Sequence, residues 1–196
     1  MQQRAGSIPP VRVWTREEMM KRVAKSGDLK GFSDGLQDSM LPECFKTTYN
    51  VIGFQMPEAA GQGSVNSPVG KTASENAAIR ISEGFNLGFV KCKPGKGVLA
   101  HNHDTNETFV VMSGRWLVQW NEGPDTESLE VGRLDCISFP PGCARRFENI
   151  THDEPEAEHM LLFVIGGDAP QNEFTPRSMQ RVAEFEQTAR YASLRS

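Results

Sequence analysis

The sequence predicts an all-β sandwich or barrel with a helix on either side of it. From residue 78 onward, short runs of β-branched, aromatic and aliphatic residues recur at the spacing of such folds. Turn signals rich in glycine, proline and acidic residues separate these runs. The predicted strands are Ile79–Ser82, Leu87–Lys91, Val98–His103, Thr108–Met112, Arg115–Trp120, Ser128–Val131, Ile137–Phe139, Arg145–Asn149 and Met160–Ile165.

The predicted helices have clear start signals. Thr15 and Glu18 are spaced as a capping box, so a helix is expected from Thr15 to about Lys25, with its methionines packed in the core. Thr175 followed by Pro176 is an N-cap with proline at the first helical position, which predicts a helix over Pro176–Ala192. Before the barrel, Val11–Trp14 alternates like a short strand with an open edge, and Leu41–Gln55 suggests a strand pair.

The stretch Pro57–Ala77 differs in composition from the rest of the chain. It is rich in glycine, serine, asparagine and alanine, and it has too few bulky apolar residues to fold alone. A loop of this length is either functional or mobile. It is therefore interpreted as a flap over the barrel or as a mobile surface loop.

Length and composition limit the class of protein. A chain of 196 residues suits one domain, and a net charge of −4 gives no basic surface for nucleic acid. The longest apolar run, Met160–Ile165, is too short to span a membrane. The N-terminus has no apolar signal region, which predicts a cytoplasmic protein. Four cysteines without a CxxC pair are expected to be free thiols, and Cys136 and Cys143 to be buried small side chains.

Three candidate metal ligands lie close together in the sequence. His101, His103 and Glu107 are separated by even numbers of residues, so an extended chain presents all three on one face. Two imidazoles and a carboxylate can hold a divalent metal with coordination positions left open. This donor set suits Fe, Mn, Ni, Co or Zn and does not choose among them.

The window Gly95–Gly114 resembles the first cupin motif at every defined position. That motif reads Gly, five residues, His-x-His, three or four residues, Glu, six residues, Gly. Pro140–Asn149 resembles the second motif, with Arg145 at the position of the family's third histidine ligand. The resemblance implies a double-stranded β-helix, or jelly roll, with a metal or ligand site inside the barrel. It divides the chain into an N-terminal arm, helix and loop (1–77), a cupin barrel (78–167) and a C-terminal helix (168–196).

Arg145 has two roles open to it. It shares strand parity with Phe147 and Asn149, so by the motif its side chain enters the barrel. A guanidinium has no lone pair for a metal. It either pairs with Glu107 and fills the vacant ligand position, leaving no metal, or it stands beside a metal and receives a carboxylate or phosphate. His159 is a weaker candidate for the missing ligand, because a lone histidine at a strand end more often meets solvent.

Two functions follow from these residues. The first is a mononuclear metal-dependent enzyme of the oxygenase type, acting on a small anionic or aromatic metabolite, with Arg145 orienting an anionic group. The alternative is a non-catalytic module that binds or senses a small anionic ligand, with Arg145 in place of the metal-binding histidine. Both readings imply a small-molecule ligand and neither involves nucleic acid or a membrane. The resemblance to cupins, which commonly form dimers, and the open strand edge at Val11–Trp14 together predict a homodimer.

Overall fold

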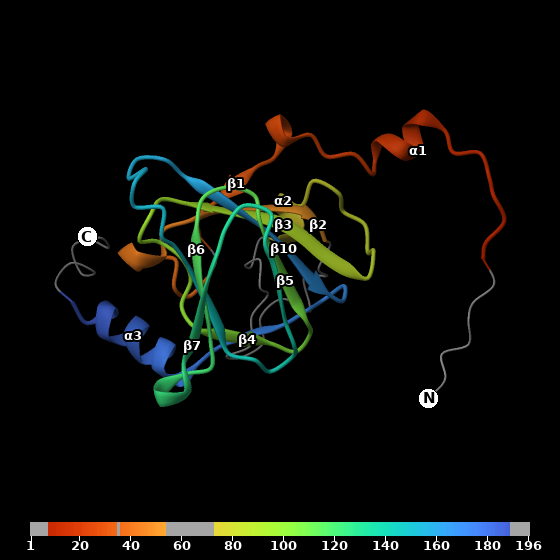
Figure 1. Cartoon of the computed structure of the whole chain (residues 1–196). Coiled ribbons are helices and arrows are strands. Elements are labelled where there is room, and N and C mark those ends of the chain that lie inside the picture. Colours follow the sequence, from red (N-terminus) through yellow and green to blue (C-terminus); the bar gives the residue numbers. More distant parts are fainter. Residues whose placement is uncertain (1–7, 35, 54–72, 189–196) are drawn as a thin grey trace.

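The structure is a computed structural model that describes residues 8–34, 36–53 and 73–188. Two antiparallel sheets face each other and enclose the core (Figure 1). The larger sheet has the order β1-β2-β3-β10-β5-β8 and the smaller β11-β4-β9-β6-β7. The predicted all-β jelly roll is confirmed. No helix within the described ranges is long and apolar enough to cross a membrane.

Most predicted strands are present, with ends that shift by up to three residues. The strands are β1 (Gly31–Phe32), β2 (Thr47–Ile52), β3 (Phe85–Cys92), β4 (His101–His103), β5 (Glu107–Val111), β6 (Trp116–Trp120), β7 (Glu127–Val131), β8 (Cys136–Phe139), β9 (Arg145–Asn149), β10 (His159–Gly166) and β11 (Asn172–Phe174). The helices are α1 (Arg16–Met20), α2 (Ala73–Asn76) and α3 (Pro176–Glu186), with 3-10 turns at Ser26–Asp28, Pro42–Cys44 and Gly123–Asp125.

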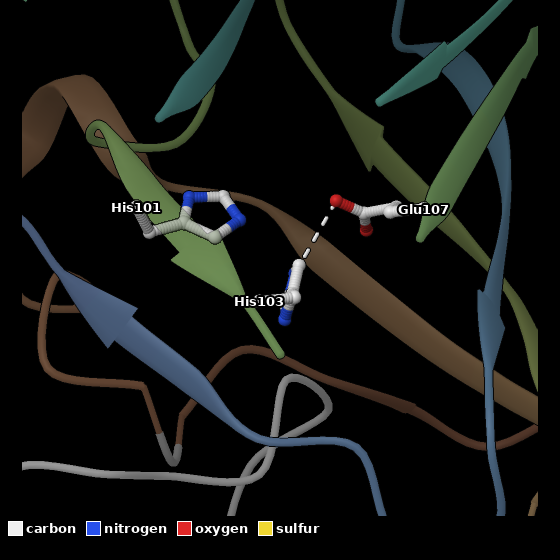
Figure 2. Close-up of side chains that lie close together, drawn as sticks. All are labelled: His101, His103 and Glu107. Carbon is white, nitrogen blue, oxygen red and sulfur yellow. Dashed lines mark ion pairs between the residues drawn. The ribbon is translucent and has the colours of Figure 1, made fainter. Parts of the chain in front are cut away.

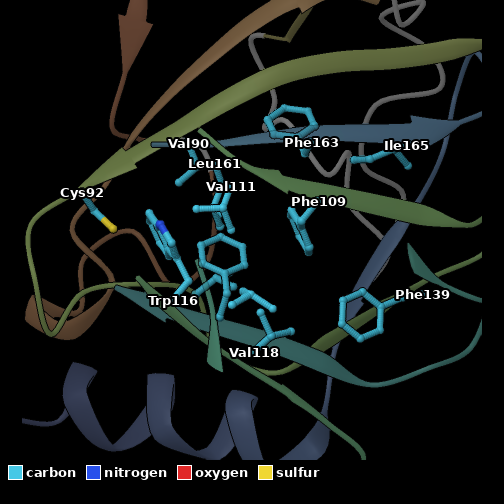
Figure 3. Close-up of a cluster of buried hydrophobic side chains, with 13 residues drawn as sticks. Val90, Cys92, Phe109, Val111, Trp116, Val118, Phe139, Leu161, Phe163 and Ile165 are labelled. Atoms are coloured by element: carbon cyan, nitrogen blue, oxygen red, sulfur yellow. The ribbon is translucent and has the colours of Figure 1, made fainter. Parts of the chain in front are cut away.

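Strand alternation places the apolar side chains of both sheets in one core. Along β10 every second residue is buried, and β3 shows the same period. The inward side chains meet in one cluster (Figure 3). Within it the ring of Phe147 lies edge-on to those of Phe109 and Trp116, with ring centroids 5.1 and 5.8 Å apart. Trp116 is fully buried, so it belongs to this core rather than to the outer surface.

The sheets extend beyond residues 78–167 on both sides. β1 and β2 join the larger sheet through β3, and β11 pairs with β4 in the smaller one. Inside the predicted limits, the strand expected at Ile79–Ser82 is reduced to a single bridge at Ile79. The division into arm, barrel and C-terminal helix therefore stays a proposal, although the barrel needs strands from outside its predicted limits.

The N-terminal segment differs most from prediction. The strand predicted at Val11–Trp14 is wrong, because the segment pairs with no described strand and Val11 and Val13 are exposed. The capping box at Thr15 is present, but α1 ends at Met20. Met19 and Met20 are about half exposed (45%), so the expected core packing is wrong. Local alternation and a cap specify backbone shape but do not supply a surface to pack on.

At the other end of the chain, the predicted helix start is confirmed. Thr175 caps α3 by accepting from the Ser178 backbone N–H. Val182 and Phe185 pack outside the barrel on Leu41 and Cys44. α3 ends at Glu186 with its C-cap at Gln187, so the predicted end at Ala192 is wrong. Residues 189–192 lie outside the described ranges, as does most of the predicted loop 57–77.

Candidate metal and ligand site

The three candidate ligands converge inside one end of the barrel. His101 and His103 are the first and last residues of β4, and Glu107 opens β5. All three are buried, and their candidate ligand atoms lie within 4.8 Å of one another. Figure 2 shows His103 and a ring nitrogen of His101 directed toward the Glu107 carboxylate. The even spacing in the sequence thus places the three side chains on the inner face.

Both imidazole rings are oriented by backbone carbonyls. His101 Nδ1 lies 2.8 Å from the Leu99 carbonyl oxygen, and His103 Nδ1 lies 2.9 Å from that of Gln171. A carbonyl only accepts, so Nδ1 carries the proton in each ring and Nε2 keeps its lone pair. His103 Nε2 is 3.3 Å from Glu107 Oε2 yet has no hydrogen bond within the described part of the chain. These two rings fit a metal ion, since ligating histidines are usually held in this way.

Arg145 lies beside the three ligands. It opens β9 directly across from His101 on β4, and its side chain is fully buried, as its strand parity predicted. Its Nε donates to Glu107 Oε2 at 3.0 Å, and its Nη1 donates to the Cys143 carbonyl at 3.0 Å. The guanidinium therefore pairs with the carboxylate of the candidate metal set.

Burial dominates the electrostatics of this cluster. Burial lowers the pKa of His101 to about 3, with the charge of Arg145 and then that of Lys46 contributing in the same direction. Burial also raises the pKa of Glu107 to about 8 and lowers that of Arg145 to about 9. The guanidinium contact favours the carboxylate form of Glu107, but removal from water is the larger effect. At neutral pH His101 is neutral and Arg145 is charged.

The candidate ligands face a small cavity of about 40 Å³. A water molecule needs roughly 10–15 Å³ on this measure, so the space admits about three such molecules. The cavity wall is mainly apolar and aromatic and includes Phe109, which shares strand parity with Glu107 on β5. Arg145 is not among the residues that line it, and its predicted role in holding a substrate stays a prediction. Lys46 and Asn172 add polar groups to the wall.

Two further charged residues near the site, Lys46 and Asp38, have no local signal in the sequence. Lys46 precedes β2, and its Nζ donates to Asp38 Oδ1 at 3.0 Å. Asp38 Oδ2 accepts from the Leu99 backbone N–H at 3.2 Å, and the Leu99 carbonyl holds His101. Residues from before the barrel motifs thus reach the candidate ligands through a chain of hydrogen bonds.

Other candidates lie away from the site. His159 opens β10, six residues before Ile165, which pairs with Glu107. At about 3.3 Å per residue, this separation puts His159 roughly 20 Å along the strand from the cluster. It contacts Glu154 instead, with a nitrogen–oxygen distance of 3.7 Å. Cys136 is exposed and Cys143 half-buried, so the expectation that both are buried is wrong, while the four described cysteines are free thiols as predicted.

Comparison with known families gives a match over part of the chain. The family model for the cupin domain matches residues 88–163. This range holds His101, His103, Glu107 and Arg145, and the fold around it is that of cupin structures. Residues 88–163 therefore form a cupin domain. No curated protein matches the sequence.

Solved structures of similar fold are distant in sequence. A structure of oxalate oxidase has a TM-score of 0.50 at 15% identity, covering 88% of this chain and 75% of that one. Oxalate decarboxylase from Lactobacillus farciminis, as a formate complex, has a TM-score of 0.50 at 12% identity, covering 83% and 40%. Vicilin from Corylus avellana (hazelnut) has a TM-score of 0.50 at 13% identity, covering 87% and 43%. This chain thus spans less than half of the last two proteins, and at such identity the likeness shows the fold alone.

Proposed function

We propose that this protein is a metal-binding cupin in which His101, His103 and Glu107 hold one divalent metal ion. The observation that carries the proposal is the orientation of the two rings, each held at Nδ1 by a backbone carbonyl. The carboxylate and both Nε2 lone pairs are thereby presented to a common point. A bound divalent ion with open positions would supply Lewis acidity to a small ligand.

Arg145 modulates this site instead of completing it. It occupies the place of the family's third histidine and donates to Glu107 Oε2, the same oxygen that approaches His103 Nε2. A metal ion and the guanidinium therefore share one carboxylate. We infer that Arg145 lowers metal affinity relative to a three-histidine site while keeping the carboxylate oriented.

The ligand of the proposed site is small and anionic. A cavity of about 40 Å³ admits a ligand of about three heavy atoms, but not an aromatic metabolite. The enzyme and the non-catalytic binder both remain candidates with such a ligand. Turnover of a small carboxylate by metal-loaded protein would favour the oxygenase-type enzyme, and stable binding without turnover would favour the binder.

Metal titration tests the proposal. Protein made without a histidine tag and stripped with chelator is titrated with Zn²⁺ and Mn²⁺ by calorimetry. Wild type is expected to bind one ion, and His103→Ala to lose at least tenfold in affinity. His152→Ala, which changes an exposed histidine in a turn, is the matched control. Absence of stoichiometric binding by wild type, or equal binding by the two variants, would reject the proposal.

We also propose that the protein is a homodimer. The N-terminal segment supports this, because Ile8, Val11 and Val13 are nearly fully exposed and α1 has no buried residue. Exposed apolar side chains gathered on one segment suit contact with a second chain. Light scattering at micromolar concentration should give the dimer mass, and a monomer mass would contradict this part of the proposal.

A further inference from the structure

A buried lysine faces the cavity from outside the region that matches the cupin family. Lys46 lies well before residue 88, where the family match begins. Its side chain is only 5% exposed, and it lines the cavity together with His101, His103 and Glu107. A buried ammonium is rare unless it is paired, so its surroundings indicate what it is for.

The ammonium is held in place by two acceptors. Lys46 Nζ donates to Asp38 Oδ1 at 3.0 Å and to the Cys44 carbonyl at 3.2 Å. An ammonium has three N–H groups, so one remains for a further acceptor. Asp38 is itself fully buried, and its second oxygen accepts from Leu99. The position of the charge is therefore fixed by the fold before any ligand arrives.

The positively charged Lys46 lines the cavity, whereas its partner Asp38 does not. Among the other lining residues that the structure describes, the charged or titratable ones are His101, His103 and Glu107. If these three hold a metal ion, the remaining polar contacts for a ligand come from Lys46, Thr48 and Asn172. Among them Lys46 carries the charge, and the Oδ1 of Asn172 is buried without a hydrogen bond in the described chain.

We propose that Lys46, fixed by Asp38, is the anion-binding residue of the cavity and selects a small carboxylate as its ligand. The carboxylate accepts the third N–H of Nζ while lying next to the candidate metal ligands. Charge-assisted hydrogen bonds to a buried ammonium are the stronger ones, and the cavity volume of about 40 Å³ limits the ligand to about the size of formate. This inference rests on the proposed function for the role of the metal, but Lys46 can be tested without metal.

The test compares formate with formamide, which has the same number of heavy atoms and no charge. Each is titrated into metal-free and zinc-loaded protein, and binding is followed by chemical shifts in NMR spectra. Wild type is expected to bind formate at least tenfold more tightly than formamide. The paired variant Asp38→Asn with Lys46→Met removes both charges at once, which buried ion pairs tolerate better than loss of one partner. It should lose tenfold to hundredfold in formate affinity while its zinc stoichiometry stays unchanged.

The matched control is Lys93→Met, which removes an exposed lysine paired with Glu156. It should bind formate as wild type does. A folded paired variant that keeps wild-type formate affinity would overturn the proposal, as would equal binding of formate and formamide by wild type.

A measurement on the unaltered protein covers the case in which the paired variant does not fold. In wild type with ¹³C-labelled lysine side chains, formate must shift the Lys46 methylene signal, and an unmoved signal overturns the proposal. Lys46-dependent formate binding in a protein that takes up no zinc would keep this inference and reject the metal site.

Discussion

Replacing Arg145 by methionine tests whether the buried guanidinium stabilises the barrel through Glu107. The substitution keeps most of the apolar volume but removes the Nε contact to Glu107 and the Nη1 contact to the Cys143 carbonyl, both 3.0 Å long. Removing one partner of a buried pair leaves the other without compensation and costs about 3–5 kcal/mol. We therefore expect Arg145→Met to lower the free energy of unfolding by about that amount.

The assay is urea unfolding of metal-free protein, because bound metal would add its own stabilisation. Arg146→Met is the matched control, since Arg146 is the next residue of β9, faces outward and pairs with Glu148 in a part-exposed contact at 3.0 Å. Such pairs contribute about 0–1 kcal/mol. Adding Glu107→Gln to Arg145→Met should recover at least about 1 kcal/mol, because position 107 then no longer carries a buried acid without its guanidinium partner. If the two single variants lose equal stability, the inward pairing of Arg145 is refuted.

Three further predictions follow from the same structure. Zinc affinity should fall by about tenfold per pH unit below pH 8, because burial raises the pKa of Glu107 to about 8 and the ion must displace the Glu107 proton. His101 has a pKa lowered to about 3, so protons compete for it only in acid. Calorimetry at pH 6, 7 and 8 checks this, and constant affinity would contradict it. Gly114→Ala should destabilise the fold by at least about 1 kcal/mol more than Gly123→Ala. Both glycines have positive φ, but a Cβ at Gly114 would meet the His159 ring at 2.5 Å, whereas Gly123 faces open space. Equal unfolding midpoints would refute this. Cys136 is exposed and should react with a thiol reagent in the native protein, whereas Cys92, buried with its pKa raised to about 12, should react only on unfolding; a fast phase that survives Cys136→Ser would show otherwise.

The features predicted correctly from the sequence depend on short-range patterns. The even spacing of His101, His103 and Glu107 specifies one face of the chain wherever the backbone is extended. The same parity argument predicted that Arg145 points inward, and it is fully buried. Gly95 and Gly114 were expected at turns, and both have positive φ. These signals are local, so they are visible without any knowledge of the fold.

The features that were missed depend on contacts distant in sequence. Asp38 and Leu99 are 61 residues apart, and no local pattern marks a charged residue before β2 as buried. The three-residue strand β11 exists because it pairs with β4, about 70 positions earlier. Conversely, Val11–Trp14 alternates as a strand does, yet the described chain offers it no partner. Pairing and burial are properties of the folded whole, so sequence periodicity alone cannot assign them.

Anomalous diffraction from a zinc-loaded crystal tests the metal site most directly. Data collected on both sides of the zinc absorption edge locate the ion without reference to the fold. We predict one peak about 2.0–2.2 Å from Nε2 of His101, Nε2 of His103 and a carboxylate oxygen of Glu107. The proposed metal site would be contradicted by a crystal that binds zinc elsewhere and shows no peak among the three side chains. In that case the Arg145–Glu107 contact would remain intact.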